Sequence, residues 1–321
     1  MSESPTTTLA DVQRIASAIT AEIARVIEGK PRQAQLAVAV LLAGGHLLIE
    51  DVPGVGKTVL AKALGRSIGG DVKRIQFTPD LLPSDVTGVS VFNQATRAFE
   101  FQRGGIFANV VLGDEINRAS PKTQSALLEA MAESQVSVDG HTYRLASPFM
   151  VIATQNPIEM EGTYPLPEAQ RDRFMARITM GYPARSSEVA MLTAQAGGDQ
   201  LATVRPVTTA QDVAAASAAL QQVYVAPAIN DYIVSIVEAT RNHADLRLGA
   251  SPRASLHLMR ASRAAAALRG RDYVIPEDVA ELCREVLEHR LLTTVEAQVA
   301  GRTPGRIVKS LLERVPTPGR G

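Results

Sequence analysis

The sequence contains no tryptophan, and it has one cysteine, Cys283, among its 321 residues. A single cysteine excludes an intramolecular disulfide framework and a cysteine-based metal cluster. Aromatic residues make up only 4% of the chain, and its 33 basic residues balance 33 acidic residues, so the formal net charge is zero. This composition lacks the basic surface and the stacking residues that are typical of nucleic-acid-binding proteins. We therefore expect no nucleic-acid partner.

Long hydrophobic runs are also missing. No stretch approaches the roughly 20 apolar residues of a membrane-spanning helix, and the Ser/Thr-rich start of the chain shows no charged-then-apolar signal pattern. These absences predict a protein with no membrane span and a cytoplasmic location, and residues 1–8 are expected to be disordered. Hydrophobic residues nevertheless make up 45% of the chain, and its length is sufficient for about two domains.

The strongest pattern lies around residue 50. A short apolar run at 47–49 predicts a buried strand, a Gly/Pro turn follows it, and an Ala/Leu/Lys segment then predicts a helix. This is the context required for a phosphate-binding loop, in which backbone N–H groups cradle a polyphosphate such as ATP. Lys57 would reach the phosphates, and the Thr58 hydroxyl would ligate Mg²⁺. The candidate nucleotide-binding residues are Pro53, Gly54, Val55, Gly56, Lys57, Thr58 and Val59.

Asp51 occupies the position where the phosphate-loop motif has its first glycine. Aspartate tolerates unusual backbone angles better than most residues, but a carboxylate beside a triphosphate is unexpected. Its side chain must therefore point away or be paired. The alternative interpretation of the whole stretch is a tight strand-to-helix turn with an incidental Lys-Thr pair.

The apolar run 109–113 ends in Asp114 and Glu115, which is the second feature required of such an ATPase. Asp114 would hold Mg²⁺ through its hydration shell, and Glu115 would orient and deprotonate the attacking water. Strand ends often expose acidic residues, so the pair gains its meaning from the phosphate loop before it. The next apolar strand, 149–154, leads to Asn156, whose amide is expected to hold water near the γ-phosphate; an Asn-Pro turn is the alternative.

A charge-rich helix end at 168–174 contains two candidate arginine fingers. Arg173 is the first choice for stabilising the transition-state charge at a neighbouring chain's nucleotide, and Arg171 is the second. Asp172 lies between them, so a purely structural ion pair on a solvated face is the alternative. Arg253 opens a helix in the second half of the chain and is expected to reach the nucleotide; an ordinary first-turn arginine is the other interpretation.

Strands alternate with helices over residues 9–183, which predicts an α/β domain with a mainly parallel sheet and helices on both faces. Within it, the alternating pattern at 88–101 and the Asp139-Gly140 turn within 135–145 predict β-hairpins. Ala-rich helical segments dominate residues 186–321, which predicts a second, all-α domain. The boundary is expected near residue 185.

With these features assembled, the chain resembles the AAA+ ATPases and, more specifically, the MoxR family. The resemblance covers nearly the whole chain beyond its first few residues. It rests on motifs at 53–58, 114–118, 153–157, 166–174, 249–253 and 276–279.

The resemblance implies an AAA+ α/β core followed by an all-α lid, assembled into a ring-shaped homo-oligomer, usually a hexamer. It casts Asn156 as sensor 1, Arg173 as the arginine finger and Arg253 as sensor 2. It also implies that the two hairpins face a central pore and touch a protein client. MoxR-like proteins are thought to act as chaperones that mature partners or insert metal into them, often together with von Willebrand factor A domain proteins.

Two positions depart from the family pattern: Asp51, and Arg171, where the family more often carries an apolar residue. The predicted function is Mg²⁺-dependent ATP hydrolysis that drives chaperone-like remodelling of a protein client. One alternative is a nucleotide-gated binding scaffold with little turnover, although a pure binder does not need a general base such as Glu115. Another is a DNA-remodelling ATPase, against which the neutral charge and the few aromatic residues speak.

Overall fold

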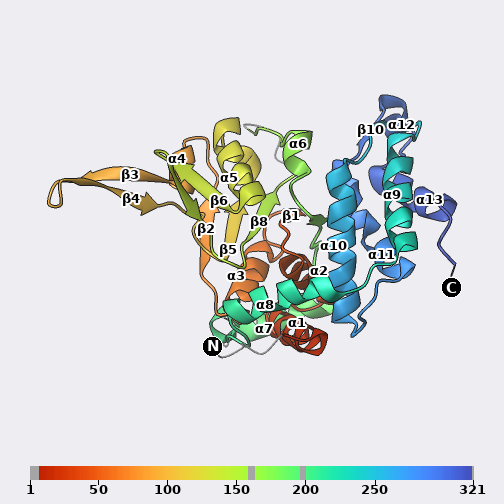
Figure 1. Ribbon diagram of the computed structural model, residues 1–321, viewed down its shortest axis with the longest axis horizontal. Helices are drawn as coiled ribbons and strands as arrows, with labels where there is room; N and C mark the ends of the chain where they lie inside the picture. The colour runs from red at the N-terminus through yellow and green to blue at the C-terminus, as the bar shows by residue number, and fades with distance from the viewer. Residues whose placement is uncertain (1–6, 158–162, 196–199, 320–321) are drawn as a thin grey trace.

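The computed structural model describes residues 7–157, 163–195 and 200–319. Its centre is a five-stranded sheet in the order β2-β5-β8-β1-β9, in which every neighbouring pair is parallel (Figure 1). The predicted parallel sheet is therefore confirmed. The strands are β1 (Leu47–Glu50), β2 (Val72–Gln76), β5 (Val110–Asp114), β8 (Met150–Gln155) and β9 (Ala176–Ile178).

Each central strand is apolar on both sides because helices cover both faces of the sheet. On β5, Val110 and Leu112 pack into one buried cluster, whereas Val111 packs into the other. The first cluster contains side chains of α1 (Leu9–Ala24), α2 (Pro31–Leu42) and α3 (Lys57–Ser67). The second contains side chains of α5 (Pro121–Glu133) and of the short α4 (Pro83–Thr87). Period-two burial of this kind fixes the register of the sheet.

The two predicted hairpins are confirmed. The first, β3 (Gly88–Asn93) with β4 (Ala98–Arg103), is a long antiparallel pair that projects away from the body of the molecule (Figure 1). The second is β6 (Gln135–Val138) with β7 (His141–Arg144). The rings of Phe101 and Tyr143 stack at 3.9 Å between centroids and join the two hairpins near their bases.

The second half of the chain is helical, as predicted. Its main helices are α9 (Pro227–Arg241), α10 (Pro252–Leu268), α11 (Pro276–Leu287), α12 (Val295–Val299) and α13 (Pro304–Arg314). This half also contains a small antiparallel pair, β10 (Leu246–Leu248) with β11 (Leu292–Thr293). These strands have only three and two residues, too few for a strand pattern to be recognisable in the sequence.

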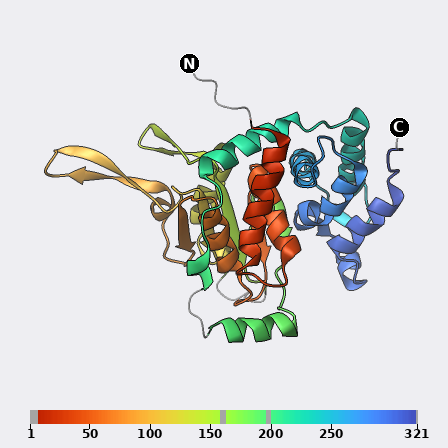
Figure 2. The ribbon, with the colours of Figure 1, turned by 90° about the horizontal axis from the view of Figure 1, so that it is seen from below.

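One helix between the two halves lies on the first domain. After α6 (Glu168–Arg171) and β9 come α7 (Arg185–Gln195) and α8 (Ala210–Ala219), and α8 packs against α1 and α2, as Figure 2 shows for α1. Val213 and Ala216 of α8 are buried in the same cluster as α1. The domain boundary near residue 185 stays a prediction, since this packing continues the first domain beyond it.

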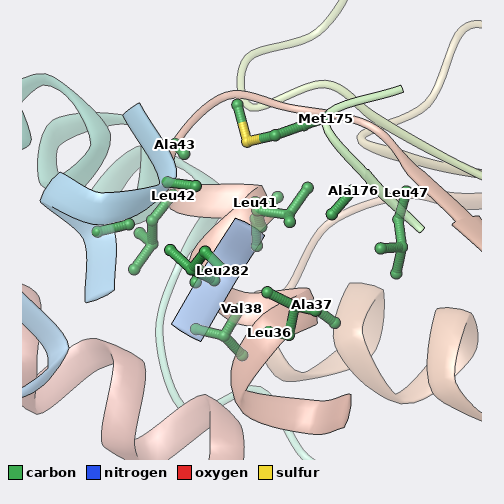
Figure 3. Close-up of a cluster of buried hydrophobic side chains, with 14 of the residues drawn as sticks. Leu36, Ala37, Val38, Leu41, Leu42, Ala43, Leu47, Met175, Ala176 and Leu282 are labelled. Carbon is green, nitrogen blue, oxygen red and sulfur yellow. The ribbon is translucent and has the colours of Figure 1, made fainter. Parts of the chain in front are cut away.

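The lid docks on the α/β core through apolar side chains (Figure 3). Leu282 of α11 is buried beside Leu36 and Val38 of α2, in the cluster that also contains Leu47 and Ala176 of the sheet. The helix α2 therefore shares its buried surface between the sheet and the lid.

Disorder was expected for residues 1–8, of which residues 1–6 lie outside the described chain. At Thr8 the expectation is wrong, because this residue begins α1 with a capping box. Its hydroxyl accepts a hydrogen bond from the Asp11 N–H, and the Asp11 carboxylate accepts one from the Thr8 N–H. Within the described ranges, none of the helices combines the length and the hydropathy that a membrane crossing requires.

Candidate functional site

The loop between β1 and α3 has the backbone shape of a phosphate loop. Gly54 and Gly56 adopt φ angles of +81° and +94°, a backbone conformation that residues other than glycine rarely adopt. A Cβ added to either glycine would meet nothing within 4 Å, so this side of the loop is open. The helix α3 begins at Lys57, and Gly56 at its N-cap has no side chain to cap it. Its first turn is therefore suited to an anion such as phosphate.

The Asp51 carboxylate is paired with backbone groups, as its position in the loop requires. The Val52 N–H donates to Oδ1 at 2.8 Å, and the Gly181 N–H donates to Oδ2 at 2.6 Å. The Lys57 ammonium donates to the Asp51 backbone oxygen at 2.7 Å. The Asp51 side chain thus links the loop to the segment that follows β9. The Lys57 side chain lies across the start of the loop.

Asp114 ends β5 and is held from both neighbouring strands. The Thr154 hydroxyl of β8 donates to Oδ1 at 2.5 Å. The Arg74 guanidinium of β2 donates to Oδ2 through Nε at 3.1 Å and through Nη2 at 2.7 Å. A carboxylate oxygen keeps further lone pairs, so Asp114 retains the capacity to accept hydrogen bonds from a hydrated cation.

Glu115 follows Asp114 in a left-handed conformation with a φ of +56°. Its N–H donates to the Thr154 hydroxyl at 2.9 Å, so that one hydroxyl contacts both acidic residues. Its Oε2 accepts hydrogen bonds from Gln76 Nε2 and from the Arg118 guanidinium, each at 3.0 Å. The carboxylate is therefore fixed at the edge of the sheet by neighbours on either side.

Asn156 lies just beyond β8, between the strands that lead to the phosphate loop and to Asp114. Gln155 pairs with Glu50 of β1, and Ala153 pairs with Gly113 of β5. Asn156 is only 6% exposed. Because the carboxyl ends of parallel strands meet at one edge of the sheet, the structure brings Asn156, Asp114, Glu115 and the phosphate loop to the same place.

The residues that would hold Mg²⁺ fit that ion. Among the described residues there is no group of three or more His, Cys, Asp or Glu side chains that could form a metal cage. Mg²⁺ is usually bound by one or two carboxylates together with substrate phosphates and water, rather than by such a cage. Thr58, in the first turn of α3, and Asp114, at the end of β5, would supply oxygen ligands for a site of this kind.

Both candidate finger arginines are partly buried in the single chain. The Arg173 guanidinium donates to the Leu128 backbone oxygen of α5 at 2.6 Å. The Arg171 Nε is buried, and the described residues provide no acceptor for it. Among the described contacts, neither arginine reaches its own chain's phosphate loop, and the choice between them stays open.

Arg253 lies in the first turn of α10 and reaches the first domain. Its Nη1 lies 3.3 Å from Oδ2 of Asp172, and Ser251, which caps α10, donates to the same carboxylate at 2.8 and 3.0 Å. Arg290 of the lid donates to Asp172 Oδ1 at 2.9 Å. Burial lowers the pKa of Arg290 to about 10, and the charge of Asp172 opposes that shift. Arg290 therefore stays protonated at neutral pH.

The buried histidines serve packing. His46 accepts a hydrogen bond at Nδ1 from the Val151 N–H and donates from Nε2 to the Met131 oxygen, both at 3.0 Å. Burial lowers its pKa to about 4. His257 accepts from the Arg290 guanidinium, and burial, assisted by that positive charge, lowers its pKa to about 3. Both rings are therefore neutral at pH 7.

Several contacting residues were given no role from the sequence: Arg74, Gln76, Arg118 and Thr154 around the acidic pair, and Ser251 and Arg290 at Asp172. A partial signal exists for two of them. On β2 only Ile75 is buried between Arg74 and Gln76, and Gln76 pairs directly with Asp114. Polar residues at the carboxyl end of a strand next to the acidic pair are candidates on that ground. Ser251 and Arg290 carry no such signal.

Known families match both halves of the chain. The model of the "ATPase family associated with various cellular activities (AAA)" matches residues 46–176, and that of the "AAA lid domain" matches residues 238–311. The fold and the site thus define an AAA-type ATPase. The chain is 37% identical to a protein from Cytophaga hutchinsonii of known crystal structure, with a TM-score of 0.90 over 97% of both chains.

Relatives define the family more closely. The chain is 42% identical to the chaperone MoxR1 of Mycobacterium tuberculosis, over 92% of this chain and 81% of that protein. It is 32% identical to the protein MoxR of Methylorubrum extorquens over 97% of both chains, and 53% identical to the protein YeaC of Bacillus subtilis over 92% of both. The chain belongs to the MoxR family of AAA+ ATPases.

Proposed function

We propose that this protein hydrolyses ATP in a ring-shaped homo-oligomer, a hexamer, and uses the cycle to remodel or mature a protein client. The observation that carries the proposal is the meeting of the open phosphate loop, Asp114, Glu115 and Asn156 at one edge of the sheet. A relative named as a chaperone supports the client role. A client containing a von Willebrand factor A domain, and metal insertion into it, are the finer form of the proposal.

In this proposal the phosphate loop binds the triphosphate through its backbone and Lys57. Bound Mg²⁺, held by Thr58 and Asp114, neutralises phosphate charge. Glu115 accepts the proton of a water whose oxygen bonds to the γ-phosphorus; the bond to the bridging oxygen breaks, and ADP leaves with that electron pair. The Asn156 amide holds the water in line.

Charge that develops on the γ-phosphate requires a further cation, and in the described contacts of the single chain neither candidate arginine reaches the phosphate loop. We assign this role to Arg173 of a neighbouring chain, with Arg171 as the second candidate, and a contact with the same nucleotide to Arg253. Assembly is then a condition for turnover, because each site consists of residues from two chains. The cytoplasmic location and the absence of a nucleic-acid partner remain predictions.

Subunit mixing tests the proposal directly. Glu115→Gln and Arg173→Ala should each bind ATP and each lose turnover. When the two variants are mixed, an Arg173→Ala chain keeps its own Glu115 and receives Arg173 from a Glu115→Gln neighbour, so turnover should partly return. Arg171→Ala, mixed in the same way, is the matched control for the choice of arginine.

Two outcomes would overturn the proposal. If the wild type binds ATP without turnover at any protein concentration and Glu115→Gln changes nothing, the protein is a nucleotide-gated scaffold. If turnover does not rise with assembly and mixing restores nothing, the site is complete within one chain. The scaffold is the second candidate because Gln76 and Arg118 already donate hydrogen bonds to Glu115 Oε2. An oxygen held in this way is not available to take a proton from water.

A further inference from the structure

The Asp172 carboxylate lies at the junction of the two domains, between the two candidate finger arginines. Three donors from the lid converge on it: the Ser251 hydroxyl, the Arg253 guanidinium and the Arg290 guanidinium. Asp172 directly follows α6 and precedes the fully buried Phe174. The turn that carries Arg173 is therefore attached to the lid through its neighbour in sequence.

Of the three lid contacts, the one from Arg290 is expected to persist. The Arg290 side chain is only 2% exposed, and its Nη2 also donates to the backbone oxygens of Asp172 at 3.2 Å and Phe174 at 2.6 Å. Release of Asp172 would leave a buried positive charge without its counterion, which is strongly unfavourable. Arg290 therefore holds the turn at 172–174 continuously.

The contact between Arg253 and Asp172 is weak by comparison. Its side chain is 45% exposed, and one nitrogen reaches Asp172 at 3.3 Å without a second parallel hydrogen bond. Ion pairs of this geometry contribute little stability and exchange readily. Arg253 also lies in the first turn of α10, where the helix dipole disfavours a cation. A carboxylate beside that turn offsets the repulsion, and a phosphate would do so equally.

We propose that Asp172 is a positioning residue that holds Arg253 while the site contains no nucleotide, releases it to the triphosphate, and keeps the turn bearing Arg173 fixed to the lid through Arg290. The proposal rests on the proposed function, since it requires Arg253 to contact ATP. A carboxylate and a phosphate compete for one guanidinium, so nucleotide binding and the release of Asp172 are the same event. Through Asp172, the position of the lid is linked to the position of Arg173 in the same chain.

The competition predicts an unusual mutant phenotype. Asp172→Asn removes the competing charge, so ATP should bind about two- to fivefold more tightly, the range expected for loss of an exposed ion pair. The gain should disappear when Arg253→Ala is also present, as a double-mutant cycle measures. The kcat of the assembled protein should fall, because the turn with Arg173 is held less firmly. Asp172→Glu keeps the charge and should bind ATP as the wild type does.

The lid provides a matched control. The pair Arg302–Asp245 is also a half-exposed arginine with a partly buried aspartate, at 2.9 Å and with 50% and 21% exposure, against 45% and 17% for Arg253–Asp172. Asp245→Asn should leave ATP affinity unchanged. If Asp172→Asn does not fold, Asp172→Asn with Arg290→Gln leaves no unpaired buried charge, and the same Arg253-dependent tightening is expected.

A purely structural Asp172 gives a different result. ATP would then bind with unchanged or lower affinity in Asp172→Asn, or the tightening would persist in the Arg253→Ala background; either outcome overturns the proposal. These outcomes are separable from failure of the proposed function. If Arg253→Ala alone leaves ATP affinity unchanged, the nucleotide contact of Arg253 fails, whereas a weaker affinity in that variant with no tightening in Asp172→Asn rejects only the role of Asp172.

Discussion

Oδ2 of Asp51 accepts a hydrogen bond from the Gly181 N–H at 2.6 Å, across a separation of 130 residues. The acidic side chain at the first position of the phosphate loop thus points to the segment that follows β9 and accepts hydrogen bonds from two backbone N–H groups. The loop is anchored by this contact at one end and by the start of α3 at Lys57 at the other.

Replacing Asp51 should therefore weaken the protein even where it restores the motif. Asp51→Gly leaves the Val52 and Gly181 N–H groups without their acceptor, so we expect the free energy of unfolding to fall by about 1–3 kcal/mol. ATP affinity should fall as well, because the start of the loop is released. Asp51→Asn keeps one carbonyl acceptor and should lose less. Urea unfolding and ATP titration measure both effects; a Gly variant that is as stable as the wild type would contradict the anchoring role.

Thr154 connects the two acidic residues of the site. Its hydroxyl donates to Asp114 and accepts from the Glu115 N–H. Thr154→Val preserves the shape but leaves that N–H unpaired, so we expect a loss of about 1–3 kcal/mol in stability and a fall in kcat of about tenfold or more, since loss of a single orienting contact has effects of this order. Thr154→Ser is the control and should retain most activity. Equal kcat in the Val and Ser variants would show that the hydroxyl does not orient the pair.

Docking of the lid on α2 should depend on Leu282. This side chain is buried against α2 (Figure 3), and truncation to alanine in such a site costs about 2–5 kcal/mol. Leu282→Ala should lower the melting temperature markedly. Leu256→Ala on the neighbouring α10 removes the same atoms from an exposed side chain and serves as the control. Similar melting temperatures for the two variants would mean that the lid is held mainly by its polar contacts.

The buried histidines give stability a defined pH dependence. The pKa of His46 is lowered to about 4 and that of His257 to about 3, whereas the unfolded chain takes up these protons near pH 6.5. The two neutral rings make their full contribution to the free energy of unfolding above about pH 6.5. It is lost as the pH falls, by about 1.4 kcal/mol per pH unit for each ring, because only the unfolded state is protonated.

Urea unfolding between pH 7.5 and 4.5 measures this slope. The range lies mostly above the ordinary pKa values of carboxylates, at about 4, so histidines dominate it. His46→Gln cannot be protonated and should lower the slope by the share of one ring, whatever its effect on the absolute stability. A wild-type slope near zero would contradict the assigned neutral state of these rings.

The sequence specified the local elements of this protein well. The strand, glycine turn and helix of residues 47–67 are contiguous, so their order alone predicts the phosphate loop, and the structure has the two positive-φ glycines that such a loop needs. The acidic pair could be assigned because it ends an apolar strand. The parallel sheet followed from the alternation of strands with helices, and the two hairpins followed from an alternating pattern and from a turn signal.

Tertiary structure alone decided which residues surround the acidic pair and how the domains are joined. Arg74 and Thr154 contact Asp114 because the strand order places β5 between β2 and β8. Ser251 and Arg290 contact Asp172 from 79 and 118 residues away. Periodicity fixes which face of a segment is buried, whereas these pairings depend on strand order, register and helix docking, which arise from contacts between segments far apart in the chain.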